Sequence, residues 1–292
     1  MQPGFYQREG IWIPAGAIKH RVEDYPEEGL ETIHRMAEKH FWYRARHRFL
    51  FEQLTRHVRG NYMELKVLDA GGGTGAWAKY LWNHGFRPMR FALGDSSLVA
   101  LRIARRELPP KIECYQIDIM QPIWHAEWDI IFCLDVLEHL DQPELALDNL
   151  RRAVRPNGIL IITVPAMPVL WSWVDEYDGH KRRYSRRDLF ELAKSRALNV
   201  LDLRYFMFSL VPLVWLARVR NAHRARRATP VELAEMAQRH HRVPPWFINE
   251  TLNALLVLEV MLNRWVSFPC GTSLAAVLTP GKLISPNDLQ AG

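Results

Sequence analysis

One stretch of the sequence decides the fold class: Val67-Leu68-Asp69-Ala70-Gly71-Gly72-Gly73-Thr74-Gly75. It begins as an apolar strand, passes through a glycine-rich turn and opens a helix-length segment at Ala76. Glycine permits positive φ angles and lets the backbone come close to a ligand. The stretch therefore indicates a site for a nucleotide-type ligand, with a tight turn that binds nothing as the alternative.

The alternation of strands and helices continues after this turn. Short apolar runs and helix-length segments follow one another, which is typical of a parallel sheet with crossover helices. The expected strands are Lys66–Ala70, Arg90–Gly94, Ile112–Ile117, Trp128–Leu134 and Gly158–Val164, and the expected helices are Ala76–His84, Leu98–Glu107 and Pro143–Val154. The sequence thus predicts an α/β fold.

The composition bounds the class of protein. The chain has 292 residues, of which 48% are apolar and 24% charged, so a globular core is expected. Three scattered cysteines do not suit a zinc cluster or a disulfide scaffold, and no metal is expected. The N-terminus lacks a secretory-signal pattern and no apolar run reaches ~18 residues, which favours a cytoplasmic location. The net charge of +6 allows an anionic partner, either a nucleic acid or a membrane face.

The glycine spacing alone leaves the ligand open. Gly71 and Gly73, followed by Ala76, also satisfy the dinucleotide pattern G-x-G-x-x-G/A. Asp95 stands 20 residues after Gly75 at the end of an expected strand, where a carboxylate accepts ribose hydroxyls in either cofactor class. Taken alone, Asp95 is also suited to cap the following helix.

Three segments together resemble class I S-adenosylmethionine-dependent methyltransferases, and most closely their small-molecule and ubiquinone-pathway members. Val67–Gly75 is similar to the first motif of the family, Asp129–Leu140 to its fourth strand and exit, and Arg155–Pro165 to its fifth strand. The resemblance implies a Rossmann-like, seven-stranded, mostly parallel sheet with helices on both faces. Asn199–Phe206 and Gly271–Leu278 would be its last two strands.

The resemblance also implies how S-adenosylmethionine binds. Asp69 and the glycines would contact the methionine part, Asp95 the ribose and Asp118 the adenine amino group, while Asp135 would lie beside the sulfonium. Carboxylates at strand ends favour a cationic sulfonium over a pyrophosphate, and thus this cofactor over NAD. The expected cofactor residues are Asp69, Gly71, Gly73, Gly75, Asp95, Ser96, Asp118, Ile119, Leu134 and Asp135.

The segment after the fifth strand is expected over the cofactor crevice. It contains Gly179-His180-Lys181-Arg182-Arg183-Tyr184, which resembles a signature of a bacterial subgroup often associated with lipid or surface-glycan pathways, and it ends in a capping-box pattern, Ser185 with Asp188. His180 is the candidate general base, because imidazole titrates near neutral pH, and a structural histidine is the alternative. His139 is a weaker candidate that otherwise orients its loop.

Candidate acceptor-binding residues come from two segments. They are Lys181, Arg182, Arg183 and Tyr184 in the signature, and Trp42, Arg44 and Arg46 in an N-terminal helical region. The basic side chains suit a phosphate or carboxylate of the acceptor, with a solvated turn as the alternative. The aromatic side chain of Trp42 is suited either to lining the acceptor site or to packing in the core.

The domain organisation has four parts. Residues 1–59 form an irregular arm up to residue 28 and then one or two helices, 60–206 the cofactor-binding core, 207–270 a helical insertion and 271–292 the last strand and tail. The insertion contains the basic residues Arg218, Arg220, Arg224, Arg226 and Arg227 between two apolar segments, Met207–Val219 and Leu252–Val266. In the second segment Asn253, Glu259, Asn263 and Arg264 fall within a ~140° wedge that leaves a broad apolar face. Such a module is suited to an anionic membrane surface, to a lid over the site, or to both.

The predicted function is S-adenosylmethionine-dependent methyl transfer to oxygen or carbon of a small-molecule, lipid or lipid-linked saccharide acceptor. The enzyme would be cytoplasmic or peripherally membrane-associated. The fourth-strand exit reads Leu134-Asp135-Val136-Leu137 and lacks the Asn/Asp-Pro-Pro-aromatic motif of base methyltransferases, which disfavours a nucleic-acid acceptor. An RNA or nucleic-acid methyltransferase, a non-catalytic cofactor-binding subunit at the membrane and, more remotely, an NAD-dependent reductase remain alternatives.

Overall fold

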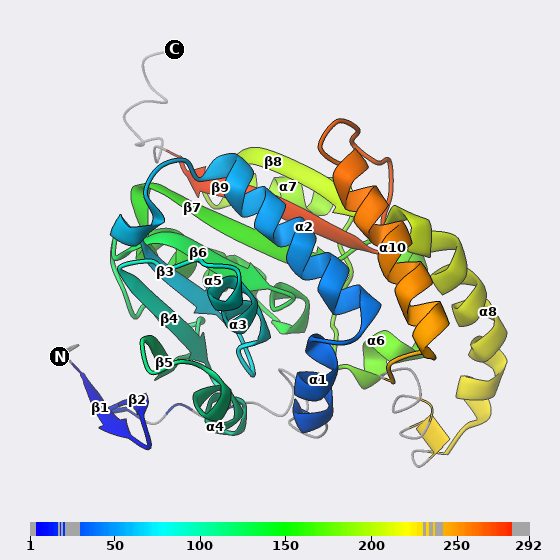
Figure 1. Ribbon diagram of the computed structural model, residues 1–292, viewed down its shortest axis with the longest axis horizontal. Coiled ribbons are helices and arrows are strands. Elements are labelled where there is room, and N and C mark those ends of the chain that lie inside the picture. Colours follow the sequence, from blue (N-terminus) through cyan, green and yellow to red (C-terminus); the bar gives the residue numbers. More distant parts are fainter. Residues whose placement is uncertain are drawn as a thin grey trace.

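The computed structural model describes residues 4–16, 18, 20, 30–229, 232–233, 236 and 242–281, and these form a single nine-stranded sheet with helices around it (Figure 1). The strands are β1 Phe5–Arg8, β2 Ile11–Pro14, β3 Lys66–Ala70, β4 Arg90–Asp95, β5 Ile112–Gln116, β6 Trp128–Leu134, β7 Val154–Pro165, β8 Leu198–Phe206 and β9 Ser273–Pro280. Their order is β1-β2-β5-β4-β3-β6-β7-β9-β8. Strands β2 to β7 pair in parallel, while β1, β8 and β9 pair antiparallel with their neighbours. The mixed α/β fold is therefore confirmed.

The prediction of seven strands is wrong in number, because residues expected as an irregular arm form a hairpin. Arg8 pairs with Ile11 across a two-residue turn, Glu9-Gly10, in which both residues have positive φ angles of 53° and 75°. This is the backbone that tight hairpins need. Ile11 pairs in parallel with Cys114 of β5 and is buried at 2% exposure. The hairpin thus extends the far edge of the sheet and leaves the order of the other seven strands unchanged.

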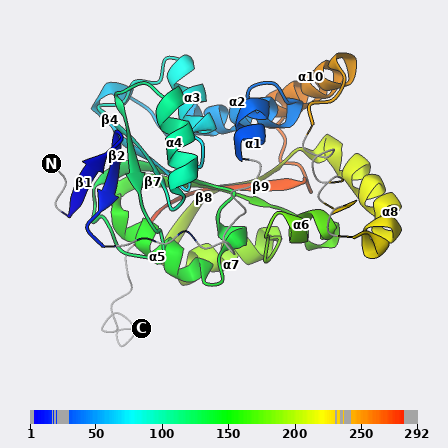
Figure 2. The same ribbon diagram turned by 90° about the horizontal axis from the view of Figure 1, so that it is seen from below.

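Helices cover both faces of the sheet, as predicted (Figure 2). One face carries α1 Leu30–Ala37, α2 Phe41–His57, α3 Ala76–Asn83 and α4 Leu98–Glu107, and the other carries α5 Pro143–Ala153 and α7 Arg186–Ser195. Each face has its own apolar core: Phe49 and Trp77 belong to the first, and Leu147 and Leu189 to the second. The two cores fix the helices on the sheet through burial of apolar surface.

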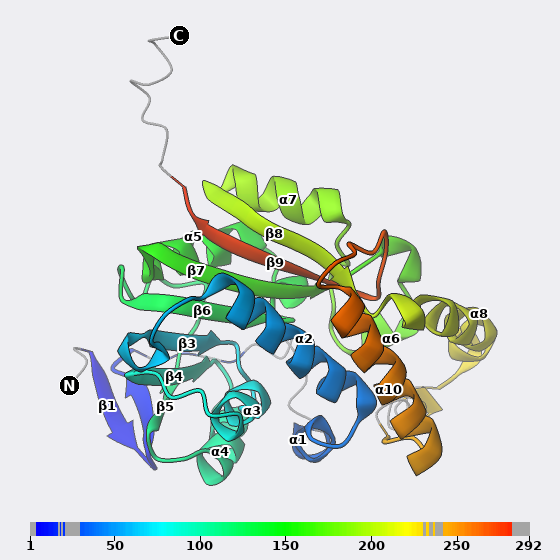
Figure 3. The same ribbon diagram turned by 45° about the horizontal axis from the view of Figure 1, so that its top comes forward.

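The insertion between β8 and β9 is helical in its described part. It comprises the short 3-10 helix η4 Phe208–Leu210, then α8 Val211–Arg227, then α10 Trp246–Leu262. Helix α10 packs along α2, whereas α8 runs out from the end of the sheet (Figure 3). Within the described residues, no helix is both long and apolar enough to cross a membrane.

The strand order also fixes where a site can form. Strands β4 and β5 lie on one side of β3, and β6 and β7 on the other, so the chain reverses direction across the sheet next to β3. Ligands of open α/β sheets bind in the crevice at such a switch point, at the carboxyl ends of the strands. The glycine turn leaves β3 at this place.

Candidate active site

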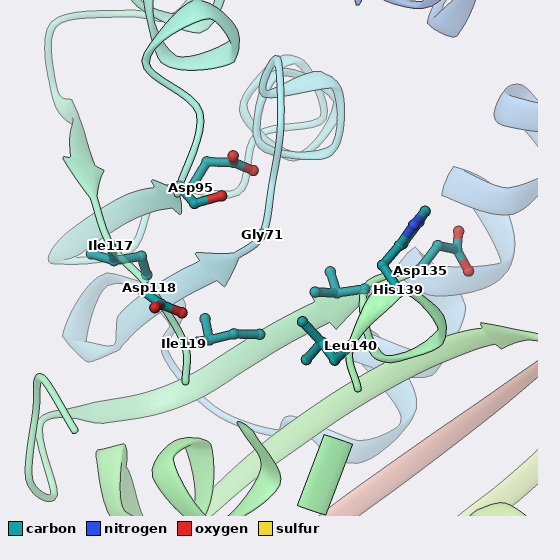
Figure 4. Close-up of a pocket in the computed structure, with 10 residues that line it drawn as sticks. Gly71, Asp95, Ile117, Asp118, Ile119, Asp135, His139 and Leu140 are labelled. Atoms are coloured by element: carbon teal, nitrogen blue, oxygen red, sulfur yellow. The ribbon is translucent and has the colours of Figure 1, made fainter. Parts of the chain in front are cut away.

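A pocket opens at the carboxyl ends of β3, β4, β5 and β6 (Figure 4). It contains about 500 Å³ of space, part of it open to solvent. Figure 4 shows Asp95 and Asp118 on one side and Asp135 and His139 on the other. The lining residues are Gly71, Asp95, Ser96, Ile117, Asp118, Ile119, Asp135, Val136, His139 and Leu140. Six of them are predicted cofactor residues, brought together from four strand ends.

The glycine turn needs glycine for two different reasons. Gly71 has a φ of 76°, and a Cβ there would lie 2.5 Å from a methyl carbon of Val136, so both the conformation and the space exclude a side chain. Gly73 has a φ of 55°, yet a Cβ there would meet nothing within 4 Å. Its backbone therefore borders open space on the Cβ side, as a ligand cradle requires. Gly75, with a φ of 81°, is the N-cap of α3.

Asp95 holds the turn in place from β4. Its side chain is 3% exposed, and its Oδ2 accepts a hydrogen bond of 2.8 Å from the Gly73 N–H, while Oδ1 accepts one of 2.9 Å from the Ser97 N–H. The cap of the following helix is Ser97 rather than Asp95, because its hydroxyl accepts from the Ala100 N–H. A carboxylate oxygen accepts more than one hydrogen bond, so Asp95 can bind the turn and ribose hydroxyls at once.

Asp69 is buried beneath the turn. It is 1% exposed, and neither carboxylate oxygen has a hydrogen-bond partner among the described residues. A Cβ on Gly72 would lie 2.6 Å from Asp69 Oδ2, which places the carboxylate against the turn. Burial raises the pKa of Asp69 to about 7, with Arg46 opposing and Asp95 reinforcing the shift. A carboxylate without donors in the interior is costly, and a cationic ligand would relieve that cost.

Asp135 directly follows β6 and has a left-handed conformation, with a φ of 56°. Its Oδ2 lies 2.6 Å from Arg46 Nη2, and its Oδ1 accepts a 3.0 Å hydrogen bond from the Thr163 hydroxyl. Arg46, expected on the acceptor side, is 7% exposed and is engaged in this ion pair. Leu134 is nearly buried at 8% exposure. Arg46 therefore holds the cofactor-side carboxylate Asp135 rather than projecting into open space.

His180 lies beside the pocket and is oriented by a buried carboxylate. Its Nδ1 is 3.1 Å from Asp175 Oδ1, and its ring is edge-to-face with that of His139, 4.9 Å between centroids. Burial, with the neighbouring His180, lowers the pKa of His139 to about 4, so His139 is neutral at pH 7. Glu138, which is fully buried, also offers a ligand-type atom within 4.8 Å of those of the two histidines.

Asp175, which is not among the predicted site residues, is the centre of an ion cluster. Its carboxylate pairs with Arg183 Nε at 2.6 Å and with Arg218 Nη1 at 2.9 Å as well as with His180. Burial would raise the pKa of Asp175, but the hydrogen bond from His180 and the charges of Arg183 and Arg218 hold it well below its ordinary value. The missed signal is the sequence Ser172-Trp173-Val174-Asp175, because Ser172 and Asp175 form a capping box at the start of α6 Trp173–Tyr177.

The other predicted acceptor residues do not converge on the pocket. Lys181 pairs with Asp141 at 2.6 Å, Arg182 donates to the Asp141 carbonyl, and Arg44 pairs with Glu250 of α10 at 2.6 Å. Tyr184 is buried at 4% exposure and donates to the Leu137 carbonyl, and Trp42 packs partly buried against the core of the first face. The predicted capping box of Ser185 and Asp188 is confirmed at the start of α7.

The residues present fit S-adenosylmethionine. Asp95 and Asp118 offer carboxylate acceptors for ribose hydroxyls and an adenine amine, and Asp69 is a buried carboxylate without a donor partner in the described chain. The positive sulfonium and ammonium of the cofactor suit such an acidic pocket, whereas a pyrophosphate does not. The donor set thus agrees with the methyl donor.

Comparisons with known proteins agree with this geometry. A family model described as a methyltransferase domain matches residues 32–203. Similar curated proteins include the ubiquinone biosynthesis O-methyltransferases of Rickettsia canadensis, 21% identical over 57% of this chain and 76% of the relative, and of Rickettsia typhi, 22% identical over 57% and 73%.

Two solved structures share the fold. One is a chain of the complex between the Haloferax volcanii Trm112 methyltransferase activator and its provisionally described methyltransferase, with a TM-score of 0.59, 16% identity and coverage of 90% of this chain and 99% of that one. The other, from Galdieria sulphuraria, is provisionally described as a sarcosine dimethylglycine methyltransferase, with a TM-score of 0.52, 17% identity and coverage of 81% and 85%. Since the family model spans more than half of the chain, the protein belongs to this methyltransferase family and is a class I S-adenosylmethionine-dependent methyltransferase.

Proposed function

We propose that the protein methylates a hydroxyl oxygen of a small apolar or lipid-linked acceptor, with His180 as the general base. The observation that carries this proposal is the pairing of His180 Nδ1 with Asp175 Oδ1, 3.1 Å apart. The His180 ring contacts the ring of His139, which lines the cofactor pocket. The names of the curated relatives, ubiquinone biosynthesis O-methyltransferases, support oxygen as the acceptor atom.

The chemistry requires one proton to leave the acceptor. S-Adenosylmethionine, held by Asp69, the glycine turn, Asp95, Asp118 and Asp135, supplies an electrophilic methyl group when bound. A hydroxyl that accepts this methyl group must lose its proton, and a positioned base near neutral pH assists that step. The buried Asp175 carboxylate accepts from Nδ1–H of His180, which leaves the lone pair on Nε2 to take the proton.

Exposed apolar side chains near Asp175 in the sequence support an apolar acceptor. Val169 and Trp171, in and next to the short helix η3 Pro168–Leu170, are large apolar side chains exposed at 72% and 37%, close in sequence to Asp175. The cationic side chains predicted to hold an anionic acceptor are instead paired: Lys181 with Asp141 and Arg183 with Asp175. Proximity and orientation would then supply most of the rate acceleration.

The first experiment separates cofactor binding from turnover. Calorimetry with S-adenosylhomocysteine should give binding that is strongly weakened by Asp95→Ala, since this change frees the Gly73 N–H and removes a ribose acceptor. Loss of binding in the wild type as well would contradict the site.

The second experiment tests the general base. With labelled S-adenosylmethionine and lipid extracts as the acceptor source, His180→Ala should lower transfer by about 10² to 10⁴ and leave S-adenosylhomocysteine binding unchanged. Added imidazole should restore part of the activity. His125→Ala, at an exposed histidine, is the matched control. Full activity in His180→Ala, or label in a carbon-bound methyl group, would overturn the assignment of base or acceptor atom respectively.

A further inference from the structure

Helix α10 is turned with its polar side inward and its apolar side outward. The polar residues Asn249, Glu259 and Asn263 are buried, at 3–5% exposure, and face the protein. The outward side carries large apolar side chains, among them Phe247 at 64%, Leu258 at 53% and Trp265, just beyond the helix, at 87% exposure. A helix on a water-facing surface has the opposite arrangement.

Hydrogen bonds fix this rotation of the helix. Glu259 Oε1 accepts from the Phe208 N–H at 2.8 Å and Oε2 accepts from the Ser209 N–H at 2.9 Å. Asn263 donates a 3.0 Å hydrogen bond to the Tyr205 carbonyl. Turning the apolar side inward would remove these partners from the Phe208 and Ser209 N–H groups and from the Tyr205 carbonyl, which is costly. The outward apolar side is therefore a property of the fold.

The exposed apolar side chains concentrate in the insertion. Fifteen of the 25 large apolar side chains found exposed in the described residues lie between Phe208 and Val266, although this segment is about a fifth of the chain. We use the term insertion face for those on α8 and α10 and just after α10. They are Leu213, Trp215, Leu216, Val219, Trp246, Phe247, Ile248, Leu255, Leu258, Met261, Leu262, Trp265 and Val266. Patches of this kind mark interaction sites.

The charged residues of α8 and α10 are basic or neutralised. Helix α8 contains arginines and no acidic residue. The two acids of α10 do not add negative charge to the face, because Glu259 is buried and Glu250 pairs with Arg44 at 2.6 Å. Of the arginine run, Arg224 and Arg226 have side chains outside the described residues. A second copy of this face would bring like charges together, whereas an anionic lipid surface is complementary to them.

We propose that the insertion face docks the protein on an anionic lipid bilayer, with α10 lying in the interfacial plane. Apolar side chains of α10 and α8 enter the headgroup region, and the exposed Arg220 and Arg227 of α8 meet anionic lipids. Trp246 and Trp265, at opposite ends of α10, are the residue type enriched at membrane interfaces. The surface is independent of the identity of the methyl acceptor.

Flotation with phosphatidylglycerol-containing vesicles tests the proposal. The wild-type protein should float at low salt, and pure phosphatidylcholine or high salt should weaken binding. The triple variant Phe247→Ser, Leu258→Ser, Trp265→Ser should lower vesicle partitioning by about tenfold or more, because three apolar anchors no longer insert.

A matched triple variant controls for general loss of apolar surface. Met63, Met89 and Leu201 are similarly exposed, at 68%, 61% and 51%, outside the insertion face, and their replacement by Ser should leave flotation unchanged. Unchanged S-adenosylhomocysteine binding in both triple variants shows that the fold and the cofactor site persist. Equal flotation of the two triple variants, or no flotation of the wild type, would overturn the proposal. A wild-type dimer that does not float and that dissociates in the first triple variant would assign the face to a second copy instead.

Discussion

Replacing the buried Asp69 by asparagine should stabilise the protein without its cofactor, and do so increasingly as the pH rises. The folded-state pKa of about 7 lies above the ordinary value of 3.8 because burial disfavours the charged carboxylate. Because the pKa is raised, ionisation of Asp69 lowers the free energy of unfolding. This loss is absent below about pH 4, grows as the pH rises, and is complete above about pH 7. The uncharged amide of the Asp69→Asn variant carries no such cost at any pH.

The magnitude follows from the two pKa values of Asp69. They differ by about three, and each pKa unit corresponds to about 1.4 kcal/mol, so the pH-dependent gain of Asp69→Asn should approach about 4 kcal/mol between pH 4 and pH 8. The slope between these limits should be near 1.4 kcal/mol per pH unit. The amide of the variant also lacks partners, which shifts all values by a constant and leaves the slope unaffected.

Urea unfolding of both proteins at several pH values measures this gain. The difference between the two free energies of unfolding isolates residue 69, because the other titrating groups cancel. The same variant should bind S-adenosylhomocysteine at least about tenfold more weakly, since it loses a charge-assisted contact to the ligand. A stability difference that stays flat from pH 4 to pH 8 would refute the reasoning, because it would mean that Asp69 ionises as an exposed carboxylate does.

Three further substitutions should change either ligand binding or the stability of the fold. Gly71→Ala should abolish S-adenosylhomocysteine binding in calorimetry, because a Cβ would lie 2.5 Å from Val136 at a φ of 76°; normal binding would contradict the turn geometry. Asp175→Ala should lower the free energy of unfolding at pH 7 by about 3 kcal/mol or more, because three cationic or hydrogen-bonded partners lose their carboxylate. Since the pKa of Asp175 is lowered in the fold, its contribution is present above about pH 4, and the variant should approach the wild type in more acidic urea titrations. Burial lowers the pKa of His47 to about 3. The free energy of unfolding of the wild type should therefore fall by up to about 1.4 kcal/mol per pH unit below pH 6.5 because of this residue. The variant His47→Phe should lack this slope in urea unfolding.

The cofactor half of the site was predictable because its residues belong to regular elements. Strands β3 and β6 begin and end where the sequence predicts, and α4 has the predicted bounds, because these segments have clear apolar periodicity. In an open parallel sheet, residues at the carboxyl ends of adjacent strands share one crevice. The strand ends, read together with the family resemblance, therefore brought Gly71, Asp95, Asp118 and Asp135 to one place.

The acceptor half was less predictable because it depends on pairings distant in sequence. Arg46 lies 89 positions before its partner Asp135, and Arg44 lies 206 positions before its partner Glu250 in the insertion. A local pattern of basic and aromatic residues carries no information on which carboxylate each cation meets. The hairpin β1-β2 was missed for a related reason: its four-residue strands are too short for a periodicity signal, and Glu9-Gly10 is a weaker turn signal than Asn-Gly or Asp-Gly.

In the insertion, the fold gives different roles to residues that are close together in the sequence. Composition alone offered two uses for α8, a lid over the site or an anchor on a membrane. Arg218 has 15% of its side chain exposed and reaches Asp175, the carboxylate that orients His180, whereas Trp215 and Val219 on the same helix are about half exposed. One side of α8 therefore completes the ion cluster beside the site, while another side belongs to the insertion face. Because both sides belong to one rigid helix, the two uses are compatible, and a variant of Arg218 tests the site whereas a variant of Trp215 tests the surface.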